Sequence, residues 1–250
     1  MKILIKSLFF FSLLLSISCQ KKASFSSISE SHIIINSKTI DSAVYKAISP
    51  YKLSHDSNMQ VVIGQSEKAL LKTDVESTLG NFFCDAVMTE TKKYLGKDSL
   101  LLNAAVFNKG GLRNSLPQGN ITIGNIFELM PFDNEVVLLK LSGIQIKDMV
   151  EKISEKGGIP VSGIRLVIKD SKPTQVTVNG QSIDESTYYW IVTSDYLANG
   201  GDNYSFFKNA IERKTTGILL RDMIITHCKA LTQKGELITS QLDGRIQLSK

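Results

Sequence analysis

Two kinds of hydrophobic spacing alternate along most of the chain. Apolar residues three or four positions apart predict helices, and short continuous or alternating apolar runs predict strands. The predicted helices are 40–50, 76–95, 124–129, 144–153 and 219–230. The predicted strands are 59–63, 100–106, 120–123, 136–141, 164–168, 175–178, 188–193 and 244–248. The run at 100–106, which is apolar except for Asn103, is typical of a strand buried on both faces, and Asn179-Gly180 favours the positive φ angles of a two-residue hairpin turn.

No Pro-rich or Gly-rich linker separates these segments, and no internal repeat is visible. Interleaved helices and strands without a linker favour one domain over two. The predicted fold is therefore a single α/β domain over 39–250, built as a mixed sheet with flanking helices.

The first forty residues have a different pattern. Two lysines precede the apolar stretch 8–17, which is too short to span a bilayer comfortably as a permanent helix, so we predict an export signal over 1–18. A small serine stands immediately before Cys19, in an arrangement that resembles a bacterial lipoprotein signal. Cys19 is therefore predicted to carry lipid and to begin a serine-rich tether over 19–38, on the periplasmic or cell-surface face of a membrane. A plain secretory signal or an uncleaved anchor is the alternative.

Composition narrows the function classes. The formal charge is +5, and loss of the predicted signal, with its two lysines and no acidic residue, lowers it to +3. Charges of both signs spread along the chain argue against nucleic-acid binding by charge alone. The chain has only three histidines, which argues against a self-contained two-metal hydrolase. Cys84 and Cys228 are predicted to be inert buried thiols, with a disulfide between them as the alternative.

Three loops have residue types that suit a ligand better than a core. Segment 108–113 (Asn-Lys-Gly-Gly-Leu-Arg) follows a predicted buried strand, and its glycines allow close backbone approach while its arginine offers a planar fork of donors. Segment 130–134 holds Phe132 beside a proline, and segment 195–202 places Tyr196 and an acidic residue around a second Gly-Gly pair. An aromatic ring and a carboxylate could stack a base and hold sugar hydroxyls. A simple turn, or a phenylalanine in the core, is the ordinary alternative.

The order of these segments and their residues resemble those of the C-terminal domain of the 5′-nucleotidase family, which includes ecto-5′-nucleotidase and the periplasmic UDP-sugar hydrolases. The resemblance covers nearly all of the chain after about residue 40. The matching segments are 76–81, 108–113, 130–134, 161–164, 196–202 and 243–246.

The resemblance implies roles for individual residues. Phe132 and Tyr196 would sandwich a base, with Tyr196 standing where the family usually has Phe. Asp202 would accept hydrogen bonds from ribose, and Arg113 would face the ribose and phosphate. The family's additional arginines before Glu76 are replaced by a segment whose single cation is Lys72, which weakens the case for phosphate affinity. The predicted substrate-binding set is Asn108, Gly110, Gly111, Arg113, Phe132, Asn134, Tyr196, Asn199, Gly201 and Asp202.

The family's metal-binding catalytic motifs are not found in this sequence. In the family, a separate N-terminal metallophosphatase domain supplies Asp-x-His and Gly-Asn-His motifs, whereas His32 lies in the tether, His55 in a predicted polar loop and His227 on the last predicted helix. No catalytic or metal-ligating residue is predicted, and divalent metals are expected on a partner metallophosphatase chain. The predicted function is recognition of a nucleotide or nucleoside for that partner; the alternatives are a stand-alone binding lipoprotein and a degenerate scaffold that has lost its pocket.

Overall fold

The computed structural model describes residues 41–249. The predicted signal 1–18, Cys19 and the tether 19–38 lie outside the described residues. The contacts between residues group the chain into two compact units, with the boundary between Ala47 and Ile48 inside helix α2 (Ser42–Met59). The sheets and the helices that follow α2 belong to the unit that begins at Ile48.

Helix α2 corrects two predictions. It runs through Pro50 to Met59, and strand β1 (Val62–Ser66) begins three residues later than the predicted strand. A proline inside a helix removes one backbone hydrogen bond and disfavours the helix without necessarily ending it. His55, predicted in a polar loop, consequently lies exposed within this helix.

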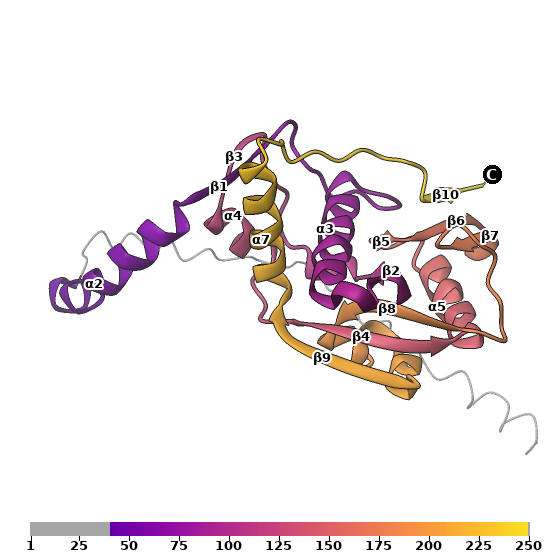
Figure 1. Cartoon of the computed structure of the whole chain (residues 1–250). Coiled ribbons are helices and arrows are strands. Elements are labelled where there is room, and N and C mark those ends of the chain that lie inside the picture. The colour runs from indigo at the N-terminus through magenta and orange to yellow at the C-terminus, as the bar shows by residue number, and fades with distance from the viewer. Residues whose placement is uncertain (1–40, 250) are drawn as a thin grey trace, which may run out of the picture. The chain divides into compact units, whose positions relative to one another are not determined.

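A five-stranded mixed sheet forms the centre of the unit (Figure 1). Its order is β5 (Val161–Ser162), β2 (Leu102–Val106), β8 (Tyr188–Ser194), β4 (Glu135–Ser142) and β9 (Glu212–Leu219). Strands β2 and β8 are parallel, and β4 is antiparallel to both β8 and β9. The α/β prediction with a mixed sheet is confirmed. Strand β9 was not predicted, because its first residues are charged and exposed at the sheet edge and leave no apolar period.

Two smaller sheets accompany the central one. Strand β1 pairs with β3 (Gly119–Thr122), and β6 (Ile164–Lys169) pairs with both β7 (Lys172–Val178) and β10 (Ile246–Leu248). The predicted Asn179-Gly180 turn has the expected positive φ angles at both residues. The tight turn between β6 and β7, which was not predicted, uses Asp170 and Ser171, also at positive φ.

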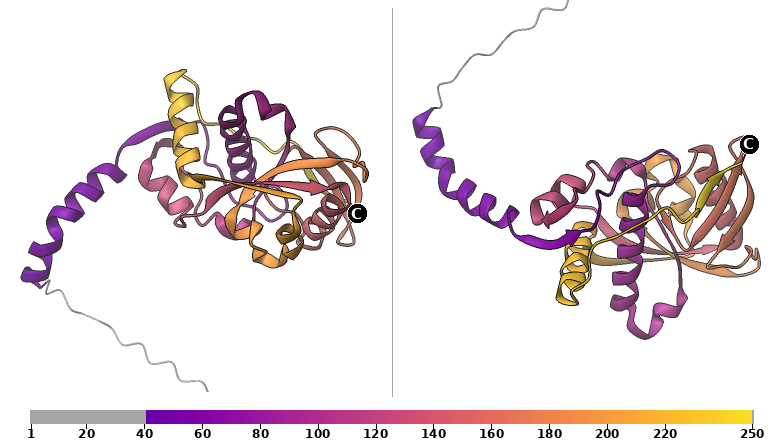
Figure 2. Two further views of the ribbon diagram at one scale, coloured as in Figure 1. Left: turned by 60° about the horizontal axis from the view of Figure 1, so that its bottom comes forward. Right: turned by 90° about the horizontal axis from the view of Figure 1, so that it is seen from above.

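The inner strands β2, β8 and β4 of the central sheet are largely buried. Successive residues of a strand point to opposite faces of the sheet, and each face is covered by a different hydrophobic cluster. Ala105 belongs to one hydrophobic cluster with side chains of α3 (Thr78–Leu95) and α7 (Leu220–Gln233), whereas Ala104 belongs to a second cluster with α5 (Gly143–Glu155). The two views of Figure 2 show α3 and α7 side by side. The short helix α4 (Ile123–Leu129) follows β3 and contacts α7.

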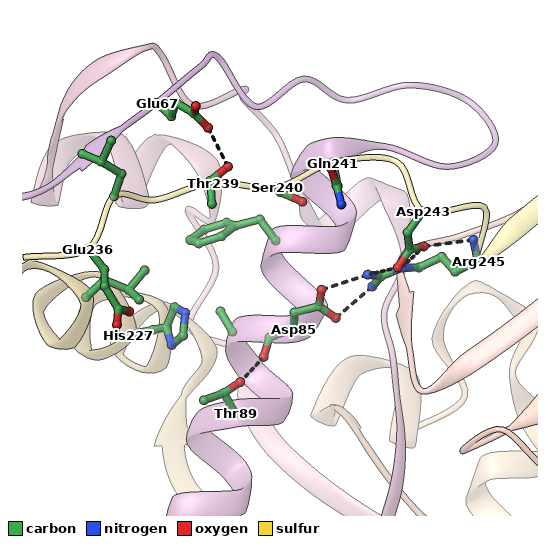
Figure 3. Close-up of a pocket in the computed structure, with 14 residues that line it drawn as sticks. Glu67, Asp85, Thr89, His227, Glu236, Thr239, Ser240, Gln241, Asp243 and Arg245 are labelled. Carbon is green, nitrogen blue, oxygen red and sulfur yellow. Dashed lines mark hydrogen bonds and ion pairs between the residues drawn. The ribbon is translucent and has the colours of Figure 1, made fainter. Parts of the chain in front are cut away.

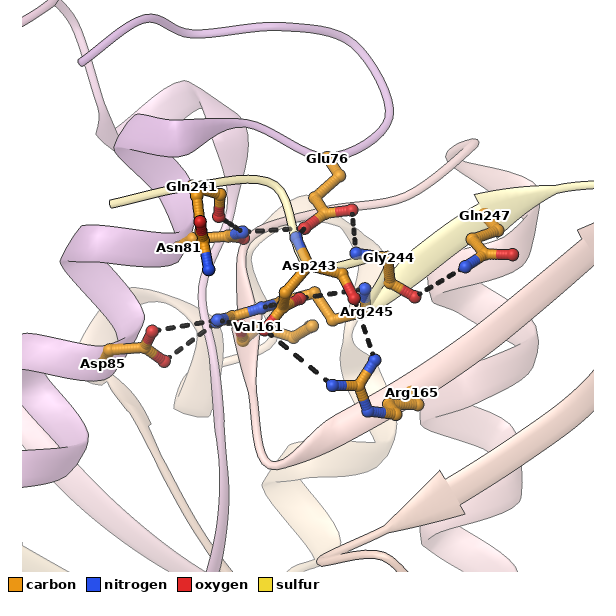
Figure 4. Close-up of polar contacts among 10 residues, drawn as sticks. All are labelled: Glu76, Asn81, Asp85, Val161, Arg165, Gln241, Asp243, Gly244, Arg245 and Gln247. Atoms are coloured by element: carbon orange, nitrogen blue, oxygen red, sulfur yellow. Dashed lines mark hydrogen bonds and ion pairs between the residues drawn. The ribbon is translucent and has the colours of Figure 1, made fainter. Parts of the chain in front are cut away.

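A polar network fastens the last segment of the chain to the start of α3 (Figure 4). The Glu76 carboxylate accepts hydrogen bonds from the Asn81 side chain at 2.7 Å and from the backbone N–H of Asp243 at 2.9 Å and of Gly244 at 3.1 Å. Arg245 donates to both Asp243 oxygens at 3.0 Å. The motifs at 76–81 and 243–246 thus contact each other, and these contacts stabilise the fold.

Both described cysteines are free and buried. Burial raises the pKa of the Cys84 thiol well above its usual value and that of Cys228 to about 12. The prediction that both thiols are buried and unpaired is confirmed. Since the thiolate is the reactive form, the raised pKa values disfavour reaction at either cysteine.

Candidate functional site

The three candidate loops meet at one edge of the central sheet. The loops after β2 and β8 leave the same edge because these strands are parallel, with Ala105 opposite Val192. The loop before β4 enters at that edge because β4 is antiparallel to β8, with Val136 opposite Ser194. Thr193 links the ends of the two strands that lead into these loops, since its buried hydroxyl donates to the Val106 carbonyl at 2.8 Å.

These loops enclose a pocket of about 330 Å³. Proteins commonly bind small ligands in pockets of about 300–1,000 Å³, so a nucleoside-sized molecule can be accommodated. Eight of the ten predicted binding residues line the pocket. They are Asn108, Gly110, Gly111, Arg113, Phe132, Asn134, Tyr196 and Asp202.

The other two predicted residues have different surroundings. The Asn199 side-chain oxygen accepts a hydrogen bond from Arg213 at 2.7 Å. Gly201 lies beneath the Tyr196 ring, where an added Cβ would sit 2.5 Å from ring carbons. Gly201 therefore makes room for the ring and does not itself line the pocket.

The two aromatic side chains are outside the hydrophobic core. Phe132 and Tyr196 are each 43% exposed and line the same pocket. The guanidinium carbon of Arg113 lies 5.9 Å from the centre of the Phe132 ring, within the range of a cation–π contact. The pocket therefore offers two accessible aromatic surfaces, as a ligand with a planar ring requires.

Tyr196 is tied to Asp202. Its hydroxyl donates to Asp202 Oδ1 at 2.8 Å and accepts from the Asp202 backbone N–H at 3.3 Å. The side-chain hydrogen bond to Asp202 raises the pKa of the Tyr196 phenol. Asp202 has a φ of 52°, so the loop curls back toward the ring of Tyr196.

Asn108 lies against the glycine pair of the first loop. A Cβ at Gly111 would be 3.0 Å from the Asn108 side-chain oxygen, and one at Gly110 would be 3.4 Å from its nitrogen. The absence of side chains at these two positions thus lets the Asn108 amide lie close to the backbone at the pocket wall.

Arg221, at the start of α7, supports the loop that carries Phe132 and was not predicted from the sequence. Its guanidinium bonds to Asp133 at 2.6 Å and to the carbonyl oxygens of Met130 and Phe132 at 3.4 Å each. It also stacks on Phe127, with 4.0 Å between the guanidinium carbon and the ring centre. Arg221 lies 88 positions beyond Asp133 in sequence, so no local pattern could have revealed it.

The electrostatics of the pocket are modest. Its lining includes one cation, Arg113, and one anion, Asp202. Lys72, the cation that replaces the expected upstream arginines, donates to the Leu112 carbonyl at 3.0 Å and lines a different, smaller cavity. Arg113 is therefore the ionised donor that the lining offers to a phosphate.

A larger pocket of about 860 Å³ lies between α3, α7 and the last segment of the chain (Figure 3). It shares no lining residue with the 330 Å³ pocket. Asp85 and Arg245 form a two-bond ion pair at 2.8 and 2.9 Å, and His227 Nδ1 lies 2.8 Å from Glu90. These groups already have partners within the fold, so the pocket is a weaker candidate for a ligand site.

Residues 41–249 contain no group of three or more His, Cys, Asp or Glu side chains arranged to hold a metal ion. None of the helices in that part of the chain combines the length and apolar character needed to cross a membrane.

Comparison with known proteins shows which family the chain resembles. The family described as 5′-nucleotidase, C-terminal domain, matches residues 62–209. The chain is 29% identical over 200 residues to the trifunctional nucleotide phosphoesterase protein YfkN of Bacillus subtilis, covering 74% of this chain and 13% of that protein. It is 29% identical over 198 residues to an apyrase of Aedes aegypti, covering 70% of this chain and 34% of that protein. A solved 5′-nucleotidase precursor from Thermus thermophilus superposes with a TM-score of 0.71 at 27% identity, over 82% of this chain and 43% of that one. The chain thus spans less than half the length of each of these proteins.

Proposed function

This chain belongs to the 5′-nucleotidase C-terminal domain family, and on that premise we propose that its 330 Å³ pocket binds the base and sugar of a nucleotide. The base lies between Phe132 and Tyr196, and Asp202 accepts a hydrogen bond from the sugar. Asn108 and Asn134 supply polar groups for the base edge, while Arg113 faces the phosphate side.

One observation carries the proposal: two half-exposed aromatic rings from different loops line the same pocket as an acid and an arginine. Stacking of a base on an aromatic ring contributes about 1–3 kcal/mol per base. The polar groups add orientation, which a stacking surface alone cannot provide.

In the proposed reaction this chain positions the substrate for a metallophosphatase encoded as a separate chain. Divalent metals on that partner would polarise the phosphoryl group and activate water. The pocket residues of this chain would hold the nucleoside end, so that the phosphate lies at a fixed place relative to those metals.

A binder that joins no enzyme is the second candidate. The pocket lining includes a single cation, which suits a nucleoside about as well as a nucleotide. The predicted export signal and lipid on Cys19 would place either form of the protein at a membrane facing the periplasm or the cell exterior.

Calorimetry with adenosine and AMP tests the binding proposal. We expect Phe132→Ala and Tyr196→Ala each to weaken adenosine binding by about 1–3 kcal/mol. Tyr188→Ala is the matched control, because Tyr188 is also exposed but does not line the pocket. Wild-type protein that binds neither compound would refute the proposal.

A phosphatase assay separates the two candidates. AMP and Mn²⁺ or Zn²⁺ are incubated with this protein, with the metallophosphatase, and with both together. Faster turnover in the mixture, reduced by Tyr196→Ala, supports the recognition subunit. Nucleoside binding with neither turnover enhancement nor measurable binding to the partner supports the stand-alone binder, and turnover by this protein alone would contradict the proposed division of labour.

A further inference from the structure

The Tyr196 hydroxyl is hydrogen-bonded to Asp202 both as a donor and as an acceptor. It donates to Asp202 Oδ1 at 2.8 Å, and Asp202 returns a backbone N–H to the same hydroxyl at 3.3 Å. The hydroxyl is therefore held on both sides and needs no ligand to order it.

The geometry of the loop keeps this pair together. Gly201 lies against the ring closely enough that an added Cβ would fall 2.5 Å from Tyr196 Cε1 and Cζ. Asp202 follows directly at a positive φ of 52°, which brings its side chain back to the hydroxyl at the far end of the ring. The ring, the glycine and the carboxylate thus form one packed unit that faces the pocket.

A carboxylate can receive the two hydroxyls of a vicinal diol most favourably when each hydroxyl has its own oxygen. With the phenol already bonded to Oδ1, one acceptor site of that oxygen is filled, so Oδ1 is a weaker acceptor for a sugar hydroxyl than the unshared Oδ2. A ribose would then donate one hydrogen bond of full strength to Oδ2 and a weaker one to Oδ1, which the phenol already shares.

Resting on the function proposed above, we infer that Tyr196 sets the sugar specificity of the pocket: its hydroxyl occupies one oxygen of Asp202, so that the site accepts 2′-deoxynucleosides about as well as ribonucleosides. A phenylalanine at this position would retain the stacking ring and release Oδ1 for the second sugar hydroxyl. Tyr196 is thus a specificity-determining residue in addition to a stacking surface.

The test compares adenosine with 2′-deoxyadenosine by calorimetry on the wild-type chain and on Tyr196→Phe. We expect the two ligands to bind the wild type within about threefold of each other. In Tyr196→Phe we expect adenosine to gain over 2′-deoxyadenosine by about tenfold or more, the effect of one added hydrogen bond to a charged group. Tyr188→Phe, which removes an exposed phenol outside the pocket, should reproduce the wild-type ratio.

The outcomes distinguish this inference from the proposed function. If both ligands bind and the ratio is the same in wild type and Tyr196→Phe, the inference is wrong while nucleoside recognition stands. A wild-type preference for adenosine that disappears in Tyr196→Phe also overturns it, because the phenol would then be orienting Asp202 toward the diol. If neither ligand binds the wild type, the proposed function fails and the specificity assigned to Tyr196 fails with it.

Discussion

Replacing Arg221 tests whether a residue outside the pocket holds the Phe132 ring in place inside it. Arg221 is 8% exposed and lines no part of the 330 Å³ pocket, yet it bonds to three residues of the loop that carries Phe132. In Arg221→Ala these contacts are lost together, so we expect the Phe132 ring to sample other positions.

The loss in unfolding free energy in Arg221→Ala is the sum of the contributions of the individual contacts. The ion pair with Asp133, whose side chain is 78% exposed, contributes about 0–1 kcal/mol. Stacking on Phe127 at 4.0 Å contributes about 1 kcal/mol. The carbonyl oxygens of Met130 and Phe132 are bonded at 3.4 Å, and losing their donor adds about 1 kcal/mol. The expected loss in unfolding free energy is therefore about 2–3 kcal/mol.

Urea unfolding measures that loss, and calorimetry at a temperature where every variant is folded measures adenosine affinity. We expect Arg221→Ala to bind adenosine about 3- to 30-fold more weakly, part of the stacking contribution of one ring. Arg221→Lys should recover only part of this, because lysine retains the charge but not the planar fork. Asp133→Asn, which removes only the exposed ion pair, is the matched control and should behave almost as wild type. If Arg221→Ala loses stability but binds adenosine as tightly as wild type, Arg221 supports the fold alone and the reasoning is refuted.

Three further predictions concern Gly201, Arg113 and Asp243. Gly201→Ala should weaken adenosine binding by about 5- to 150-fold in calorimetry, because its Cβ would lie 2.5 Å from the Tyr196 ring and displace it; unchanged affinity would show that the ring can move aside freely. Arg113→Gln should abolish any preference for AMP over adenosine while changing adenosine affinity little, and a preserved preference would point to another cation. The hydrogen bond from Arg245 holds the pKa of Asp243 below its ordinary value of 3.8, so the stability it adds is present above about pH 4 and is lost as the pH falls through the lower, folded-state pKa. Urea unfolding from about pH 6 to about pH 2 should therefore show a shallower acid decline in Asp243→Asn than in the wild type, and parallel declines would contradict the assignment.

The candidate loops could be predicted because their composition is local. Paired glycines next to an arginine or an acid, directly after an apolar strand, are visible in any short window of the sequence. Their meeting at one edge depends on β2 pairing in parallel with β8 and on β4 running antiparallel to β8. These pairings join segments distant along the chain, and no periodicity in the sequence specifies them.

The errors have equally physical origins. Strand β9 begins Glu212-Arg213-Lys214, which looks like a loop, but its backbone is fixed by pairing with β4. Helix α2 continues past Pro50, where a sequence rule that stops helices at proline is too strict. The role of Arg221 was not predicted because the residues that it contacts in the Phe132 loop are all far from it in the sequence.

The two pocket rings combine partial exposure with a place in the lining of the same pocket, which sets them apart from the aromatic residues of the core. Tyr204 and Phe207, a few residues beyond Tyr196, are essentially fully buried, whereas Tyr196 and Phe132 are each 43% exposed. Burial of apolar surface contributes about 25 cal/mol of favourable free energy per Å². The exposed part of each ring lacks this contribution, and a flat ligand that covered the ring would supply it. Because Arg113 and Asp202 balance in charge around these rings, the recovered apolar burial would supply most of the affinity and the polar groups would decide which ligand is accepted. From that division we expect the phenol of Tyr196, which adds a polar group to one stacking surface, to affect specificity more than affinity.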